Sequence, residues 1–134
     1  MKLRNRIFFD FFMLLVFVAL QMNDATGNAV HEILGAAIVI LVVIHCLINR
    51  KWIMNLRKAK KSRLIINFAL LAVFFVAIFS GMMQSDFLLG QAKAGDTERW
   101  FHMHAVSTRV MIAIGLLHIL IHRKMIAAAF RRRK

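Results

Sequence analysis

The chain has 134 residues, of which 60% are hydrophobic and 19% are charged, and it contains no proline. Its mean hydropathy is +0.67. A soluble domain is about half apolar, so this composition excludes an ordinary soluble fold. The net charge of +13 would suit nucleic-acid binding, but the positions of the basic residues favour a membrane protein with no nucleic-acid partner.

The apolar residues are gathered into four stretches, in chain order about residues 7–22, 30–48, 64–83 and 101–121. Each is about as long as the roughly 17–25 helical residues that cross a bilayer core. A backbone in hydrocarbon must satisfy its own hydrogen bonds, and a barrel would show period-two alternation. The sequence therefore predicts an all-α fold, a transmembrane four-helix up-and-down bundle that forms one membrane domain over residues 1–134.

The basic residues predict the orientation of this multi-pass protein. Sixteen of the 19 lie before the first stretch, between the second and third, or after the fourth: Lys2, Arg4, Arg6, Arg50, Lys51, Arg57, Lys58, Lys60, Lys61, Arg63, Arg123, Lys124 and residues 131–134. The positive-inside rule then places both termini and the 50–63 loop in the cytoplasm, in contact with lipid head groups. The first stretch resembles a signal peptide but lacks a convincing small-residue cleavage site, so we expect an uncleaved anchor.

The chain contains an internal repeat. Residues 31–51 and 104–124 share the pattern His-x13-His-x-Leu-Ile-x-Arg-Lys, and residues 6–10 align with residues 63–67. Because repeats of this kind mark the structural unit, we expect two repeated helical hairpins, over about residues 1–52 and 63–124.

Four histidines occupy equivalent places in this repeat. A spacing of 14 residues corresponds to about 1400° of helix rotation and about 21 Å of rise, so the two histidines of one helix lie near one face at two levels. The second and fourth helices run in the same direction and stand diagonally across the predicted bundle. We therefore expect an outer pair, His31 with His104, and an inner pair, His45 with His118.

Paired imidazoles at two levels are typical of two b-type haems with low-spin irons that transfer electrons. A mononuclear zinc or copper site suits the pattern less well, because the histidines of one helix are about 21 Å apart along its axis. The single cysteine, Cys46, excludes paired-cysteine metal sites, and the lack of Cys-x-x-Cys-His excludes covalent c-type haem. Gly35 and Gly115 would let a porphyrin approach the backbone, and Gly27 and Gly81 could do the same for the outer haem.

Three further polar residues, Asp10, Asn67 and Arg109, lie at membrane depth. Arg109 needs an anionic partner there, for which a haem propionate is the natural candidate. Asp10 matches Asn67 in the repeat; it either takes part in proton transfer at a quinone site or reaches the membrane interface, and we favour the interface.

Two histidines remain outside the pairs. His102 is about 200° of rotation from His104, so it points away if His104 points inward; it is the main competitor as a ligand. His122 lies one turn beyond His118 on the same face. It could contact a propionate or a quinone, although a histidine at the cytoplasmic interface is the simpler interpretation.

Together, residues 31–35, residues 45–52, Ser80-Gly81 and the helix from His104 to His118 resemble the flavinylation-associated cytochrome family, small bacterial four-helix membrane proteins. The resemblance covers roughly residues 7–124. It implies an inner-membrane location, two non-covalent haem b groups, and iron ligation by His31, His45, His104 and His118. It also implies electron exchange between quinol or a cytoplasmic donor and extracytoplasmic flavoproteins that carry covalent FMN.

Two other classes of function are compatible with the sequence. A small proton-coupled transporter would use four short helices and Asp10, but it has no need of paired histidines. A non-catalytic anchor subunit of a redox complex would hold haem mainly for structure. A haem spectrum separates the transporter from the other two, and reduction by a quinol analogue separates the electron carrier from the anchor.

Overall fold

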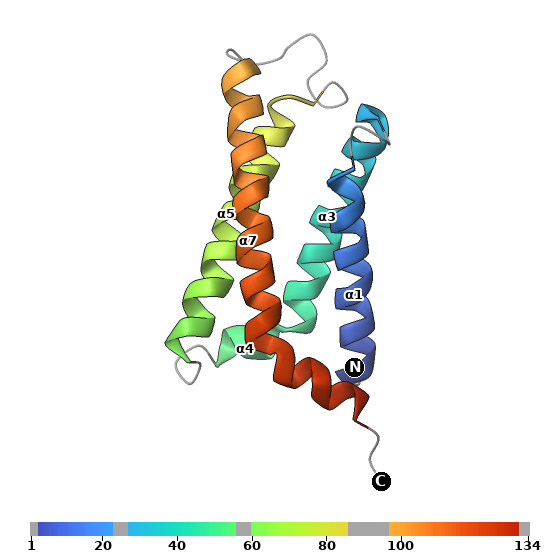
Figure 1. The fold of residues 1–134 in the computed structure, drawn as a ribbon, viewed down its shortest axis with the longest axis vertical. Coiled ribbons are helices and arrows are strands. Elements are labelled where there is room, and N and C mark those ends of the chain that lie inside the picture. Colours follow the sequence, from blue (N-terminus) through green and yellow to red (C-terminus); the bar gives the residue numbers. More distant parts are fainter. Residues whose placement is uncertain (1–2, 23–26, 56–59, 86–96, 132–134) are drawn as a thin grey trace. The chain divides into compact units, whose positions relative to one another are not determined.

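The structure, a computed structural model, describes residues 3–22, 27–55, 60–85 and 97–131. Every regular element in these segments is a helix, with four long helices and one short one (Figure 1). In chain order they are α1 (Leu3–Leu20), α3 (Asn28–Ile48), α4 (Arg50–Met54), α5 (Lys61–Met82) and α7 (Thr97–Phe130). The predicted all-α fold class is therefore confirmed, and the four long helices are consistent with a helical bundle.

Three of these helices are long and apolar enough to cross a membrane: α3, α5 and residues 97–128 of α7. Only between 6% and 17% of the residues in their apolar windows are buried inside the protein. Apolar faces of this size are covered by lipid in a membrane protein, and the chain is accordingly a multi-pass membrane protein. Helix α1 is also apolar, but its 18 residues carry Arg4, Arg6 and Asp10.

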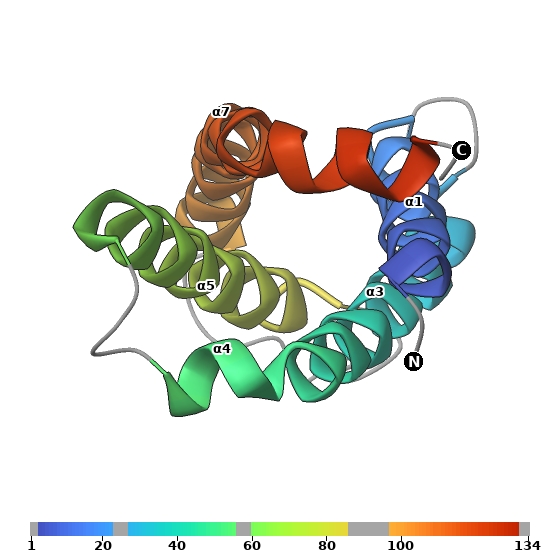
Figure 2. The same cartoon turned by 90° about the horizontal axis from the view of Figure 1, so that it is seen from below.

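The chain divides into two compact units, which largely follow the predicted repeat. The first comprises residues 1–58 and 123–134, and the second residues 59–122. In the first unit α1 and α3 lie side by side and antiparallel, as do α5 and α7 in the second (Figures 1 and 2). The organisation of the whole chain as one membrane domain stays a prediction.

The residues at the two ends of α3 suit the conformations that they adopt. Gly27, directly before α3, has a φ of 80°, a left-handed conformation that glycine adopts at little cost. At the other end, the side-chain amide of Asn49 donates to the carbonyl oxygen of His45 over 3.0 Å. Helix α3 ends there, and the short helix α4 begins at Arg50.

Helix α7 continues to Phe130, past the predicted end at residue 121. No glycine or proline follows Gly115 to stop it, and alanines, the best helix formers, fill positions 127–129. Within the first unit, the ring of Phe130 packs edge-on against that of Phe8, with centroids 6.3 Å apart. The hydrophobic pattern predicted the apolar span and missed this helical extension, because Arg123 and Lys124 interrupt the apolar run.

Small residues line the packing surface of α5 and α7 in the second unit. Ala77, Ser80 and Ser107 are buried, and Ser80 is fully so. The hydroxyl of Ser80 donates to the carbonyl oxygen of Val76, and that of Ser107 donates to the carbonyl oxygen of His104. Small side chains let membrane helices approach closely, and this close approach positions His104 against α5.

Candidate haem-ligand site

In the first unit, α1 holds both histidines of α3 through their Nδ1 atoms. Nδ1 of His45 lies 2.7 Å from Oδ1 of Asp10, in the first half of α1. Nδ1 of His31 lies 3.1 Å from the backbone oxygen of Leu20, the last residue of α1. Both rings are half-buried. The antiparallel hairpin thus fixes two imidazoles at two levels.

The second unit repeats this arrangement between α5 and α7. Nδ1 of His118 lies 3.0 Å from Oδ1 of Asn67, near the start of α5. Nδ1 of His104 lies 2.8 Å from the backbone oxygen of Ala77, towards the end of α5. These two rings are half-buried as well.

The four hydrogen bonds join residues at equivalent positions of the sequence repeat. The offset from Asp10 to Asn67 equals the offset from Leu20 to Ala77, and the offset from His31 to His104 equals that from His45 to His118. Each hairpin therefore holds its two histidines by equivalent atoms. A chance set of interfacial histidines has no reason to share acceptors in this way.

These acceptors determine the tautomer of each ring. Backbone carbonyls, a carboxylate and an amide oxygen accept hydrogen bonds, so each Nδ1 carries the hydrogen, and the lone pair of the neutral ring lies on Nε2. Metal-binding histidines characteristically donate their other ring N–H to a carbonyl or carboxylate, which fixes the ring and raises its basicity. The donor set therefore fits the axial ligation of haem by four neutral imidazoles.

Each predicted pair of histidines has one member in each of the two units. His31 and His45 belong to the first unit, whereas His104 and His118 belong to the second. The outer pair and the inner pair stay predictions. Among the described residues, no group of three or more His, Cys, Asp or Glu side chains is placed to hold a metal ion; a haem with two axial imidazoles needs no such group.

The glycines predicted beside the haems differ in their surroundings. Apart from the nearby backbone of its own helix, a Cβ added to Gly35 or Gly115 would meet nothing within 4 Å, and the approach of a porphyrin there stays a prediction. A Cβ on Gly81 would lie 3.1 Å from Cε1 of His104. Gly81 therefore makes room for an imidazole ring, and its expected role beside the outer haem stays a prediction.

Asp10 also differs from expectation. It was expected to reach the interface, yet its carboxylate accepts the hydrogen bond of the His45 ring. Its alignment with Asn67 was the signal that could have identified this role, because Asn67 serves His118 in the same way.

Arg6 is a residue to which the sequence analysis gave a place in the topology and the repeat but no role in the site. Among the described residues, its Nε is a buried nitrogen without a hydrogen-bond partner. It lies one turn before Asp10 on α1, at the end of the hairpin that holds His45. A guanidinium nitrogen in this position suits an anionic group such as a propionate.

Arg109, in contrast, is exposed on α7. It is about 180° of rotation from His118 and about 140° from His104, so it does not share the face of either ring. Its role as a propionate partner stays a prediction, and the geometry of its own helix argues against it.

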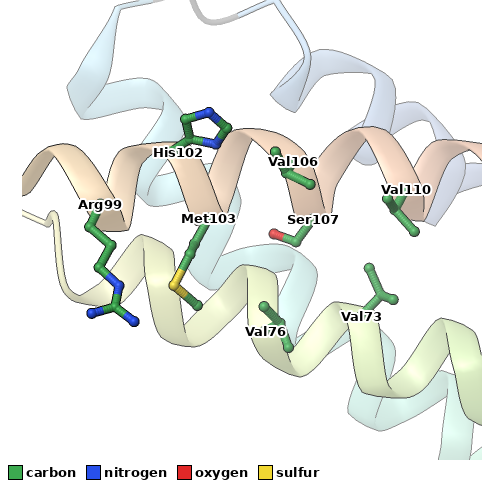
Figure 3. A pocket seen from close by; sticks show the side chains of 8 residues that line it. All are labelled: Val73, Val76, Arg99, His102, Met103, Val106, Ser107 and Val110. Atoms are coloured by element: carbon green, nitrogen blue, oxygen red, sulfur yellow. The ribbon is translucent and has the colours of Figure 1, made fainter.

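His102 lies apart from His104, as the spacing predicted. It is exposed and lines an open groove of about 440 Å³ along α5 and α7, together with Val73, Val76, Arg99, Met103, Val106, Ser107 and Val110. Figure 3 shows Met103 pointing towards α5 and His102 pointing away from it. The groove contains none of the four histidines that follow the repeat.

His122 packs against a predicted ligand. Its ring centroid lies 4.7 Å from that of His118, with the ring planes inclined by 50°. This contact bears out the expected placement one turn beyond His118 on the same face. His122 thus lies beside His118, and the equivalent position of the first hairpin is occupied by Asn49.

Comparison with protein families, with curated proteins and with solved structures finds no match for this chain.

Proposed function

We propose that the chain is a di-haem b-type membrane cytochrome that carries electrons across the bacterial inner membrane. The observation that carries the proposal is the repeated set of four hydrogen bonds from histidine Nδ1 atoms to α1 and α5. They orient the rings and put the lone pair on Nε2, as metal ligation requires. The likeness to the flavinylation-associated cytochromes leads to the same function.

When bound, each haem supplies an iron that gains and loses one electron. His31 and His104 would hold the outer iron, and His45 and His118 the inner one. Gly35 and Gly115, where a built Cβ meets nothing within 4 Å, are the positions at which the macrocycle would approach the backbone. Because each iron would have two protein ligands and no open position, the protein residues favour electron transfer over oxygen binding.

The proposed path runs between the two sides of the membrane. With both termini cytoplasmic, the inner pair lies near a quinol or cytoplasmic donor, and the outer pair near an extracytoplasmic protein acceptor. The family likeness suggests a flavoprotein as that acceptor. If quinol is the donor, the protein also has quinol-oxidising activity.

The test of this proposal is the haem content of the purified full-length chain, measured by pyridine haemochrome after expression with ample haem supply. We expect about two haem b per chain, with Soret and α bands of low-spin bis-histidine iron. A colourless protein would refute the proposal and favour the proton-coupled transporter. If neither a quinol analogue nor a reductant added on the cytoplasmic side reduces the bound haem in vesicles, the result would favour the structural anchor.

Arg6 provides a more local prediction. Replacing Arg6 with glutamine should weaken haem binding by about tenfold or more, because a charge-assisted hydrogen bond to a buried group contributes roughly 1.5–3 kcal/mol. Haem titration of the apoprotein measures the change. Arg63→Gln is the matched control, since Arg63 occupies the same repeat position and is exposed. Equal effects of the two substitutions would contradict a propionate contact at Arg6.

A further inference from the structure

The two hairpins hold their outer histidines by the same kind of acceptor and their inner histidines by different ones. At the outer level, both histidines are held by backbone carbonyls, those of Leu20 and Ala77. At the inner level, His118 is held by the neutral amide of Asn67, whereas His45 is held by the carboxyl group of Asp10. The shortest of the four contacts, at 2.7 Å, is the one with the carboxyl group.

We infer that Asp10 is a positioning residue that lowers the midpoint potential of the inner haem below that of the outer haem, and so directs electrons outward. This inference rests on the proposed function. Asp10 acts through the ring of His45, and Asn67 is its neutral counterpart in the second hairpin.

The physical basis is the charge carried by the acceptor. A carboxylate that accepts the Nδ1 hydrogen raises the basicity of Nε2, which makes the imidazole a stronger electron donor to the metal. A negative charge near the iron also stabilises the more positive oxidised state. A neutral amide or carbonyl has the same directional effect on the ring without the net charge. The inner level therefore favours oxidation, and the outer level, with two carbonyl acceptors, does so less.

The redox balance needs only the partners already proposed. Haem held by His45 and His118 would give up one electron, and haem held by His31 and His104 would take it up. The proposed donor would resupply that electron to the inner level, and the proposed acceptor would remove it from the outer level. Transfer from the lower to the higher potential runs from the cytoplasmic to the extracytoplasmic side.

The repeat offers its own matched variants for a test. Asp10→Asn makes the first hairpin resemble the second and retains a hydrogen-bond acceptor, so it changes charge with little change in shape. Asn67→Asp makes the second hairpin resemble the first. The double variant moves the carboxylate from one side of the inner iron to the other, because His45 and His118 are expected to share that iron.

The experiment is a redox titration of the full-length haem-loaded protein, followed at the α band. We expect Asp10→Asn to raise the lower of the two potentials and leave the higher one in place. Asn67→Asp should depress the same lower potential further, and the double variant should return it close to the wild-type value. As a reference, Asp10→Ala removes the acceptor, which should weaken binding of one haem by about 10- to 100-fold.

Unchanged potentials in Asp10→Asn, with both haems bound, would overturn the inference and leave the proposed function standing. A shift of the higher potential by Asn67→Asp would overturn the shared inner iron. If Asp10→Asn does not load haem, Asn67→Asp still decides the matter, since an unmoved lower potential in that variant refutes the role of charge. A wild-type protein without haem would refute the proposed function itself.

Discussion

Replacement of His45 by alanine is expected to lower the haem content from two to about one per chain. The same loss is expected for His118→Ala, because both imidazoles serve the inner iron in the proposed arrangement. Neither substitution removes a residue of the outer pair, so one haem should remain. Pyridine haemochrome and the amplitude of the α band measure the loss, and circular dichroism checks that helical content is retained.

Two other histidines of the chain serve as controls for this prediction. His102→Ala removes an exposed ring that lies outside the repeat, and His122→Ala removes a ring that packs on His118 without following the repeat. Both variants should retain two haems. If His45→Ala keeps both haems, or if His102→Ala loses one, the assignment of the four ligands is wrong.

A leucine at Gly81 is expected to abolish binding of the outer haem while the inner haem remains. A Cβ at this position would lie 3.1 Å from Cε1 and 3.2 Å from Nδ1 of His104, inside ordinary contact distance. The larger side chain must push the ring away and break its 2.8 Å hydrogen bond to the oxygen of Ala77. The closely packed Ser80 leaves α5 little room to retreat.

Haem content and redox titration of a graded series test this steric argument. Gly81→Ala should weaken outer-haem binding less than Gly81→Leu does, because its side chain is smaller. Alanine also stabilises the helix by about 1 kcal/mol relative to glycine, so any loss of haem in this variant comes from the contact with the ring. Ala72→Leu is the control, because Ala72 is exposed and lies about 180° of rotation from Gly81 on the same helix. If Gly81→Leu keeps its full haem content, contact with the His104 ring is not the reason that position 81 is a glycine.

The sequence by itself determined the helices, their repeat and the spacing of the histidines. Hydropathy over whole segments and the helical period are properties of local sequence, so they predicted α3, α5 and the apolar part of α7 within a few residues. The same period placed His102 off the face of His104, and the structure agrees. The position of His122 beside His118 followed from one turn of helix.

Only the tertiary structure decided what holds each ring. The acceptors for His31 and His104 are the backbone carbonyls of Leu20 and Ala77. Because every residue type has a backbone carbonyl, no pattern of side chains predicts these two contacts. The sequence favours the interface for Asp10 because its partner, His45, is distant in sequence and reaches it only through the folding of the hairpin. The roles of these residues depend on how two helices are placed side by side, which local sequence does not specify.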